Sequence, residues 1–328
     1  MKEIKINGHE IPIVSMNTAI VRVGATGLSA ADRLHAYGQE DIAIICENML
    51  FSTSRESASD KQTYYKLTLS GGQPDSVRKM AEMLYKGQCV DGDIALAEAA
   101  LSAQCFYRLA DLGVPFPVNR YGETIGYKTD HDPLQRATSA GPLTSKMMTE
   151  CLTRSVRQRG VKIYEGYQVI SVIAENNRVF GLLCLKIKQV DVKAEYLLFN
   201  CKNVVFATGG PAGMYADSVY PASQYGSTGI AFEAGVKGKN LTEWQYGIAS
   251  LRPRWNVSGT YMQALPRFFS TDAEGNDEKE FLRSYFRNAR TIFLPSFQNA
   301  LTMFQLPSLP LPTLLCFLPR HLSCSCAS

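Results

Sequence analysis

The sequence predicts an α/β fold with a parallel sheet and a β-rich insertion. Three observations lead to this class. Apolar runs of strand length alternate with helix-like stretches in the first half of the chain. Turns that contain glycine separate these runs, as is usual where a strand passes into a helix. After residue 160, strand-length runs follow one another without an intervening helix, a pattern typical of antiparallel strands.

The first part of the chain predicts a hairpin and then a β–turn–α–β unit. Residues 2–14 alternate weakly around Asn7-Gly8, a pair of residues that favours a tight hairpin turn. An apolar run over 18–23 precedes a helix-like stretch over 28–37, and 41–46 is a second apolar run. Because two strands joined through a helix pair in parallel, this unit predicts a parallel sheet.

The same periodicities predict the later elements. Helices are expected over 75–87, 92–112, 143–159 and 228–235. Strands are expected over 161–164, 167–174, 179–187, 195–199 and 203–207.

Charge and cysteine usage narrow the classes of function. Of the 328 residues, 45% are hydrophobic and 20% are charged, which is a globular composition. The net charge of +4 arises wholly after Glu280, so no nucleic-acid surface is expected. None of the nine cysteines forms a C-x-x-C pair, which predicts no metal site, no disulfide framework and a cytoplasmic location. The start of the chain has no apolar signal-peptide core.

The C-terminal stretch differs from the rest of the chain. No charged residue lies between Arg290 and Arg320, and five prolines interrupt this segment. Its longest proline-free run, 296–306, is too short to cross a membrane, so no membrane association is expected. We expect 291–328 to be a disordered or foreign tail, and the alternative is a tail that packs on a partner.

A glycine turn after the first strand carries the first chemical signal. The dinucleotide fingerprint G-x-G-x-x-G has Gly24 and Gly27 at its second and third glycine positions, and Arg22 at its first. Gly24 would let backbone approach a pyrophosphate, and Gly27 would let the helix pack closely on the sheet. Glu47, twenty residues after Gly27, could bind a ribose hydroxyl pair. The alternative is a strand–helix turn whose glycines are incidental.

Two later motifs extend this pattern. The strand over 203–207 runs into Thr208-Gly209-Gly210, where bare backbone could face a flat or phosphorylated ligand, or could simply end the strand. A segment with Gly226, Gly229 and Gly235 then precedes Glu243 and Gln245.

In this order, over residues 18–247, the motifs resemble the flavoprotein subunit family of fumarate reductase and succinate dehydrogenase, which includes L-aspartate oxidase. The resemblance implies a Rossmann-like FAD-binding fold and bound FAD. It implies an FAD-binding domain over 1–250, a partial substrate-capping domain over 251–290, and the tail over 291–328.

The resemblance also implies which residues contact FAD. Gly24, Ala25 and Gly27 would face the pyrophosphate, and Glu47 the adenosine ribose. The loop that wraps the flavin would supply Thr53, Ser54, Ser59 and Asp60. The backbone of Val169 would contact adenine. The residues beside the flavin ring would be Ala207, Thr208, Gly209, Glu243 and Gln245.

Several departures from the family pattern qualify these expectations. The loop over 50–60 lacks the histidine that links FAD covalently in succinate dehydrogenases, so noncovalent FAD is expected. The family's G-D-G is Ser227-Thr228-Gly229 in this chain. The second half of the capping domain and its substrate-clamping residues have no counterpart, so the chain resembles a truncated member with no assignable catalytic residues.

The resemblance implies an FAD-dependent oxidoreductase that transfers hydride between flavin and an unsaturated or saturated carboxylic acid. The small-molecule substrate would be a carboxylic acid such as a dicarboxylate, and the electron-transfer partner stays unidentified. The alternative is a truncated, catalytically inactive fragment with weak or no nucleotide binding.

One further segment, 127–145, contains Asp130-His131-Asp132 and Arg136. A histidine and an arginine beside a flavin could bind a carboxylate or assist proton transfer. The favoured interpretation is a capped, solvated loop whose acids balance its arginine.

Overall fold

The computed structural model describes part of the 328-residue chain. The described residues are 2–59, 62–86, 90–129, 132–187, 194–216, 218, 220–239, 241, 249–251, 254–256, 267–280 and 314–318. The chain divides into two compact units, which are described separately. The first comprises Met1–Gln62, Phe106–Phe116 and Ala140–Lys239. The second comprises Thr63–Cys105, Pro117–Ser139 and Asn240–Ser328.

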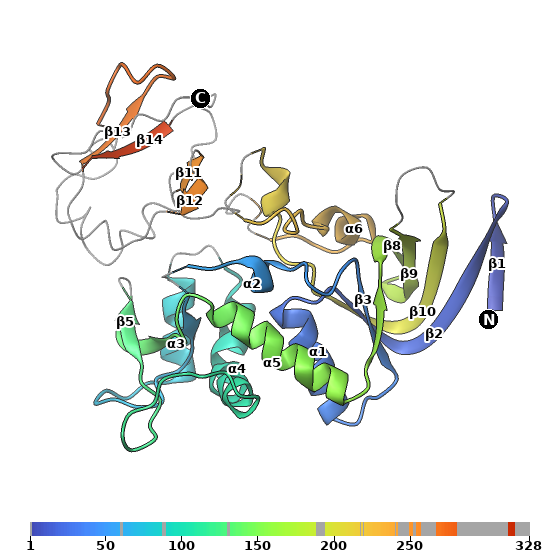
Figure 1. Cartoon of the computed structure of the whole chain (residues 1–328), viewed down its shortest axis with the longest axis horizontal. Helices are drawn as coiled ribbons and strands as arrows, with labels where there is room; N and C mark the ends of the chain where they lie inside the picture. The colour runs from blue at the N-terminus through green and yellow to red at the C-terminus, as the bar shows by residue number, and fades with distance from the viewer. Residues whose placement is uncertain are drawn as a thin grey trace. The chain divides into compact units, whose positions relative to one another are not determined.

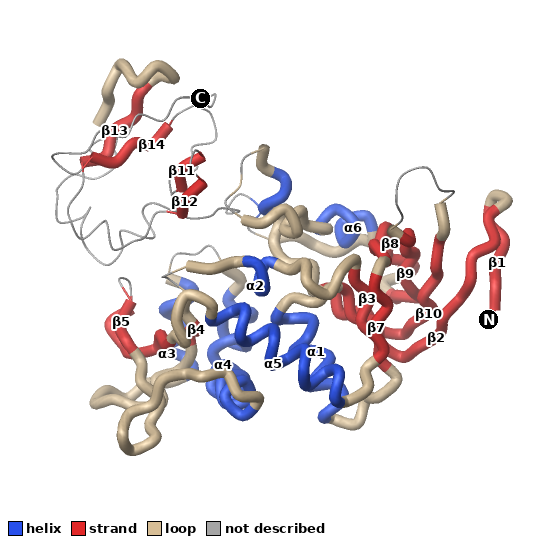
Figure 2. Tube along the Cα trace, viewed as in Figure 1, coloured by secondary structure: helices blue, strands red, loops and turns tan. Residues whose placement is uncertain are grey.

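The first unit is built on a mixed seven-stranded sheet (Figure 1, Figure 2). Its strands are β1 (Lys2–Ile6), β2 (His9–Val21), β3 (Ile42–Cys46), β7 (Lys162–Glu165), β8 (Tyr167–Glu175), β9 (Arg178–Lys186) and β10 (Tyr196–Phe206). Strands β7, β3, β2 and β10 are parallel neighbours in that order. Strands β9 and β8 continue the sheet antiparallel, so the predicted α/β class and β-rich insertion are confirmed.

The N-terminal hairpin and the β–α–β unit form as predicted. β1 pairs with β2 through Asn7 and Gly8, both at positive φ, the backbone that a two-residue hairpin turn requires. Helix α1 (Ala25–Ala36) connects β2 to its parallel neighbour β3. Its buried side, which includes Leu28 and Ala31, packs on the sheet.

Helix α5 (Thr144–Gln158) lies beside α1 (Figure 1), and a buried carboxylate joins the two helices. Asp32 of α1 is fully buried and accepts two hydrogen bonds from Arg108, both 2.8 Å. Arg108 belongs to helix α4 (Gly92–Asp111). Ser155 Oγ and Arg159 Nε also donate to Asp32, at 2.6 and 3.0 Å. These four bonds fix the orientation of α1 within the first unit.

The structure corrects the expectation of two strands over 195–199 and 203–207, because β10 is continuous from Tyr196 to Phe206. The polar residues Asn200 and Lys202 interrupt the apolar run in the sequence. They are the exposed members of a period-two alternation in which Phe199 and Cys201 are buried.

The second unit contains α3 (Val77–Tyr85), the N-terminal part of α4, and a small sheet of β4 (Tyr64–Tyr65), β6 (Asp132–Thr138) and β5 (Tyr127–Thr129). Arg136 was expected in a solvated loop. The structure instead places it in strand β6, where its side chain is 1% exposed. It binds Asp75 through two bonds of 2.6 and 2.9 Å and Asp132 at 3.0 Å. The acids do balance the charge of Arg136, as predicted, but all three side chains are buried. Asp130 and His131 lie outside the described residues.

Short strands make up the rest of the described second unit. β11 (Ala249–Leu251) pairs with β12 (Arg254–Asn256), and β13 (Arg267–Thr271) with β14 (Leu314–Leu318). The five residues of β14 are uncharged and lie between Pro312 and Pro319. The expectation that 291–328 is a disordered or foreign tail stays a prediction. Among the described helices, none has the length and apolar character to cross a bilayer.

Candidate dinucleotide-binding site

Three predicted segments meet at one edge of the large sheet. The parallel register places Val21 of β2 beside Phe206 of β10 and Ile45 of β3. The residues that follow each strand therefore emerge together at its carboxyl end, where ligands bind in open α/β sheets. The glycine turn follows β2, Glu47 follows β3, and Ala207-Thr208-Gly209 follows β10.

The glycine turn has the close backbone approach that the fingerprint requires. A Cβ atom on Gly27 would lie 2.2 Å from the Arg22 carbonyl oxygen, so no larger residue fits without a shift. Gly24 is the N-cap of α1 and provides no side-chain cap. The first N–H groups of the helix are thus presented at the sheet edge, where a helix N-terminus favours a phosphate.

The Ser/Thr loop lies against this turn. Helix α2 (Thr53–Glu56) follows β3, and Ser54 Oγ accepts a hydrogen bond of 3.3 Å from the Ala25 backbone N–H. The Ser52 hydroxyl is buried and has no hydrogen-bond partner among the described residues. A buried polar group without a partner is costly, so the Ser52 hydroxyl is compatible with a polar group of a ligand. Ser59 donates its backbone N–H to the Pro142 carbonyl at 3.1 Å.

The end of β10 completes the predicted set in the first unit. Thr208 is buried, and the Ala207 methyl would contact a Cβ at Gly27 at 3.6 Å. Gly209 has a φ of +77°, a left-handed conformation that favours glycine. The predicted approach of bare backbone to a ligand is therefore compatible with this turn.

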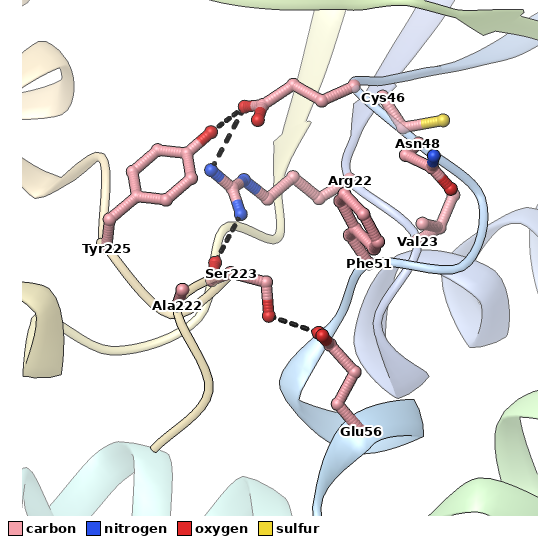
Figure 3. Close-up of a pocket in the computed structure, with 10 residues that line it drawn as sticks. Arg22, Val23, Cys46, Asn48, Phe51, Glu56, Ala222, Ser223 and Tyr225 are labelled. Atoms are coloured by element: carbon pink, nitrogen blue, oxygen red, sulfur yellow. Dashed lines mark hydrogen bonds and ion pairs between the residues drawn. The ribbon is translucent and has the colours of Figure 1, made fainter. Parts of the chain in front are cut away.

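A cavity of about 290 Å³ lies between the ends of β2 and β3, helix α2 and residues 222–225. The Arg22 side chain crosses this cavity (Figure 3). Its guanidinium donates to Glu47 Oε1 at 3.2 Å and to the Ser223 carbonyl at 2.9 Å, and lies 4.2 Å from the centre of the Tyr225 ring. The Tyr225 hydroxyl also donates to Glu47. The predicted ribose-binding carboxylate is thus engaged by two side chains of its own chain.

Burial perturbs both members of this ion pair. It raises the pKa of Glu47 against the opposing effect of Arg22, and lowers the pKa of Arg22 against the opposing effect of Glu47. Desolvation therefore outweighs mutual attraction for each group. Burial, with the nearby Glu165 and Glu47 carboxylates, also raises the pKa of the Cys46 thiol to about 12, so this thiol is not a nucleophile.

The remaining predicted residues do not line the cavity or lie outside the described residues. Val169 is buried in β8, the last strand of the sheet, opposite Cys184 of β9, and an irregular register follows it. Its predicted contact with adenine stays a prediction. Asp60, Glu243 and Gln245 lie outside the described residues.

The sequence interpretation did not include Ser223, Gln224 and Tyr225. These residues lie between the glycine motifs at 209–210 and 226–229, and that position is the one sequence signal that could have indicated them. Gln224 donates to the Gly210 carbonyl at 2.9 Å, and Thr53 donates to Gln224.

Comparisons with known proteins agree with this geometry. Residues 18–294 match the model of a family described as the FAD binding domain. L-aspartate oxidase of Mesorhizobium japonicum is 26% identical over 184 residues, which are 55% of this chain and 34% of that protein. L-aspartate oxidase of Clostridium acetobutylicum is 25% identical over 160 residues, 48% of this chain and 32% of that protein. The chain spans about a third of the length of these relatives.

Solved structures share the fold. A mutant of E. coli quinol fumarate reductase FrdA superimposes with a TM-score of 0.70 at 17% identity, covering 95% of this chain and 55% of that one. The open conformation of a flavocytochrome c3 fumarate reductase gives a TM-score of 0.64 at 17% identity, covering 81% and 48%.

The fold and the family match define a flavoprotein domain that binds a dinucleotide. The chain belongs to the FAD binding domain family, and the predicted relation to fumarate reductase, succinate dehydrogenase and L-aspartate oxidase flavoproteins is confirmed. The predicted cofactor, FAD, is likewise confirmed at the level of the family. The close approach at Gly27 and the unpartnered hydroxyl of Ser52 fit such a ligand.

Proposed function

We propose that the first unit binds FAD noncovalently at the carboxyl edge of β2, β3 and β10. Gly24, Ala25 and Gly27 would receive the pyrophosphate and Glu47 the adenosine ribose. The Ser/Thr loop and Ala207-Thr208-Gly209 would hold the flavin end. The observation that carries this proposal is the convergence of the three segments on one sheet edge beside the buried, unpartnered Ser52 hydroxyl.

Two observations support noncovalent binding. Neither α2 nor the residue before it supplies a histidine, and the Cys46 thiol is held protonated by burial. When bound, FAD supplies hydride transfer, and the protein positions and shields it. The residues of this chain then hold the phosphates at a helix N-terminus and keep the ribose end polar.

The reaction we propose is oxidation or reduction of a carboxylic acid, with a dicarboxylate as the first candidate. The names of the relatives, L-aspartate oxidase and fumarate reductase, support this substrate class. A cytoplasmic location is consistent with the free thiols of Cys46, Cys105, Cys151, Cys184 and Cys201.

Two measurements test the proposal. Purified protein should be yellow, and denaturing precipitation should release all flavin to the supernatant, whereas flavin in the pellet would contradict noncovalent binding. Flavin-loaded protein should then be assayed for fumarate reduction by a reduced dye and for aspartate oxidation. Activity with neither acid would contradict the substrate class, and failure to bind FAD at all would contradict the proposal as a whole.

The second candidate function is a catalytically inactive fragment that binds nucleotide weakly. The ion pair between Arg22 and Glu47 favours it, because a ribose must compete with a guanidinium for the same carboxylate. Retention of flavin through dialysis, with turnover of either acid, would exclude this alternative.

A further inference from the structure

The segment Ser223–Tyr225, here called the strap, contacts five residues in and around the proposed FAD site. Ser223 donates its hydroxyl to Glu56 of α2, and its carbonyl accepts from Arg22. Gln224 is bonded to Thr53 and to the Gly210 carbonyl. Tyr225 donates to Glu47 and places its ring against Arg22 (Figure 3).

The strap joins parts of the site that are remote in sequence. Its partners follow β2, β3 and β10 and include α2, so three consecutive residues are bonded to each of the segments that converge at this sheet edge. Two of these partners belong to the proposed FAD site: the ribose-binding carboxylate of Glu47 and the loop hydroxyl of Thr53.

We propose that the strap and Arg22 form a self-occluding closure over the ribose-binding carboxylate and the Ser/Thr loop of the site, which FAD must displace in order to bind. This inference rests on the proposed FAD site and adds a regulation of that site. Binding would exchange the Tyr225 and Arg22 contacts on Glu47 for ribose hydroxyls, and the Gln224 contact on Thr53 for a group of the cofactor. The strap therefore limits the rate at which FAD enters, and its own contacts are lost in the bound state.

Tyr225→Phe and Gln224→Ala test this closure in the full chain. Each removes strap hydrogen bonds while leaving Gly24, Gly27 and Glu47 in place. The chain offers a matched control in Arg33 and Tyr37, a second stacked arginine–tyrosine pair at the other end of α1, with 4.8 Å between guanidinium and ring centre. Tyr37→Phe removes the same hydroxyl at an exposed position.

The first readout is FAD association, followed by quenching of FAD fluorescence after rapid mixing. Tyr225→Phe should raise the association rate constant roughly ten- to a hundredfold, as expected when one hydrogen bond to a charged group is removed from the closed state. Gln224→Ala should raise it in the same direction, and Tyr37→Phe should not change it. An unchanged association rate in both strap variants, or a faster dissociation alone, would overturn the proposal. Faster dissociation alone would mean that the strap covers bound FAD instead.

The second readout needs no FAD. Chymotrypsin cleaves after tyrosine and after phenylalanine, so cleavage at position 225 reports release of the strap in both the original chain and Tyr225→Phe. Cleavage there should be faster in Tyr225→Phe and in Gln224→Ala than in the original chain, and unchanged cleavage contradicts the closure. If cleavage is accelerated while no form binds FAD, the strap is confirmed as a closure and the proposed cofactor site is wrong.

Discussion

Replacing Asp32 by asparagine should destabilise the first unit by about 2–3 kcal/mol. The carboxylate is fully buried, and burial alone would raise its pKa, but hydrogen bonds from Arg108, Ser155 and Arg159 outweigh burial and bring the pKa from 3.8 to about 2. This shift corresponds to about 2 kcal/mol of stability at neutral pH. Breaking a fully buried ion pair costs about 3–5 kcal/mol, but both arginines are 26% exposed, so water solvates part of the charge that is left.

The pH dependence gives this prediction its sign. A depressed folded-state pKa contributes stability that is present above the unfolded pKa and lost as the pH falls through the folded pKa. The free energy of unfolding should therefore decrease between about pH 4 and pH 2, partly because Asp32 takes up a proton. Urea unfolding followed by circular dichroism at several pH values measures this decrease. The difference between the original chain and Asp32→Asn should shrink by about 2 kcal/mol across that window.

Asp41→Asn provides the matched control, because Asp41 is exposed and its backbone carbonyl, rather than its carboxylate, accepts from Asn17 and Thr18. Its free energy of unfolding should lie within about 0.5 kcal/mol of that of the original chain, as is usual for surface substitutions. An equally small loss of unfolding free energy in Asp32→Asn would contradict a stabilising role of the buried carboxylate. So would a difference between the original chain and Asp32→Asn that stays constant from pH 5 to pH 2.

Four further substitutions test the site, the fourth as a control for the third. Arg22→Gly should increase the fraction of protein that retains FAD after dialysis, because it removes a guanidinium from the cavity, and equal retention would contradict this. Glu47→Ala should weaken FAD binding by about 1.5–3 kcal/mol in a fluorescence titration, the range for hydrogen bonds to charged groups; an unchanged Kd would make Glu47 structural only. Gly27→Ala should lower stability by about 1–3 kcal/mol through overpacking against the Arg22 carbonyl, whereas Gly24→Ala, with Ser54 Oγ at 3.6 Å, should be tolerated in a thermal melt.

Local patterns were sufficient to predict the elements that surround the site. The hairpin at Asn7-Gly8, the strand–helix unit and the place of Glu47 after the second parallel strand each depend on residues close together in sequence. The two strands expected over 195–199 and 203–207 are one strand, β10, in which a period-two alternation of burial continues through Asn200 and Lys202.

The contacts that fill the site could not be predicted in this way. Tyr225 meets Glu47 across 178 positions, and Arg22 meets the Ser223 carbonyl across 201. The same limit applies to Arg136, whose partner Asp75 is 61 positions away. Such pairs are fixed by the packing of whole elements, and no periodicity in one segment encodes its remote partner.

Two substitutions at Arg22 separate the effect of its side chain on FAD binding from the effect of its unusual backbone conformation. Arg22 has a φ of +78°, a conformation that costs a non-glycine residue about 1–2 kcal/mol. Its contacts with Glu47, Ser223 and Tyr225 offset that cost only while the cavity is closed. Arg22→Ala keeps the unfavourable backbone and removes the contacts, whereas Arg22→Gly removes both. If the guanidinium obstructs FAD, both variants should bind FAD more tightly than the original chain, and glycine should give the higher melting temperature of the two. Tighter binding with glycine but not with alanine would assign the effect to the backbone and refute a role for the guanidinium.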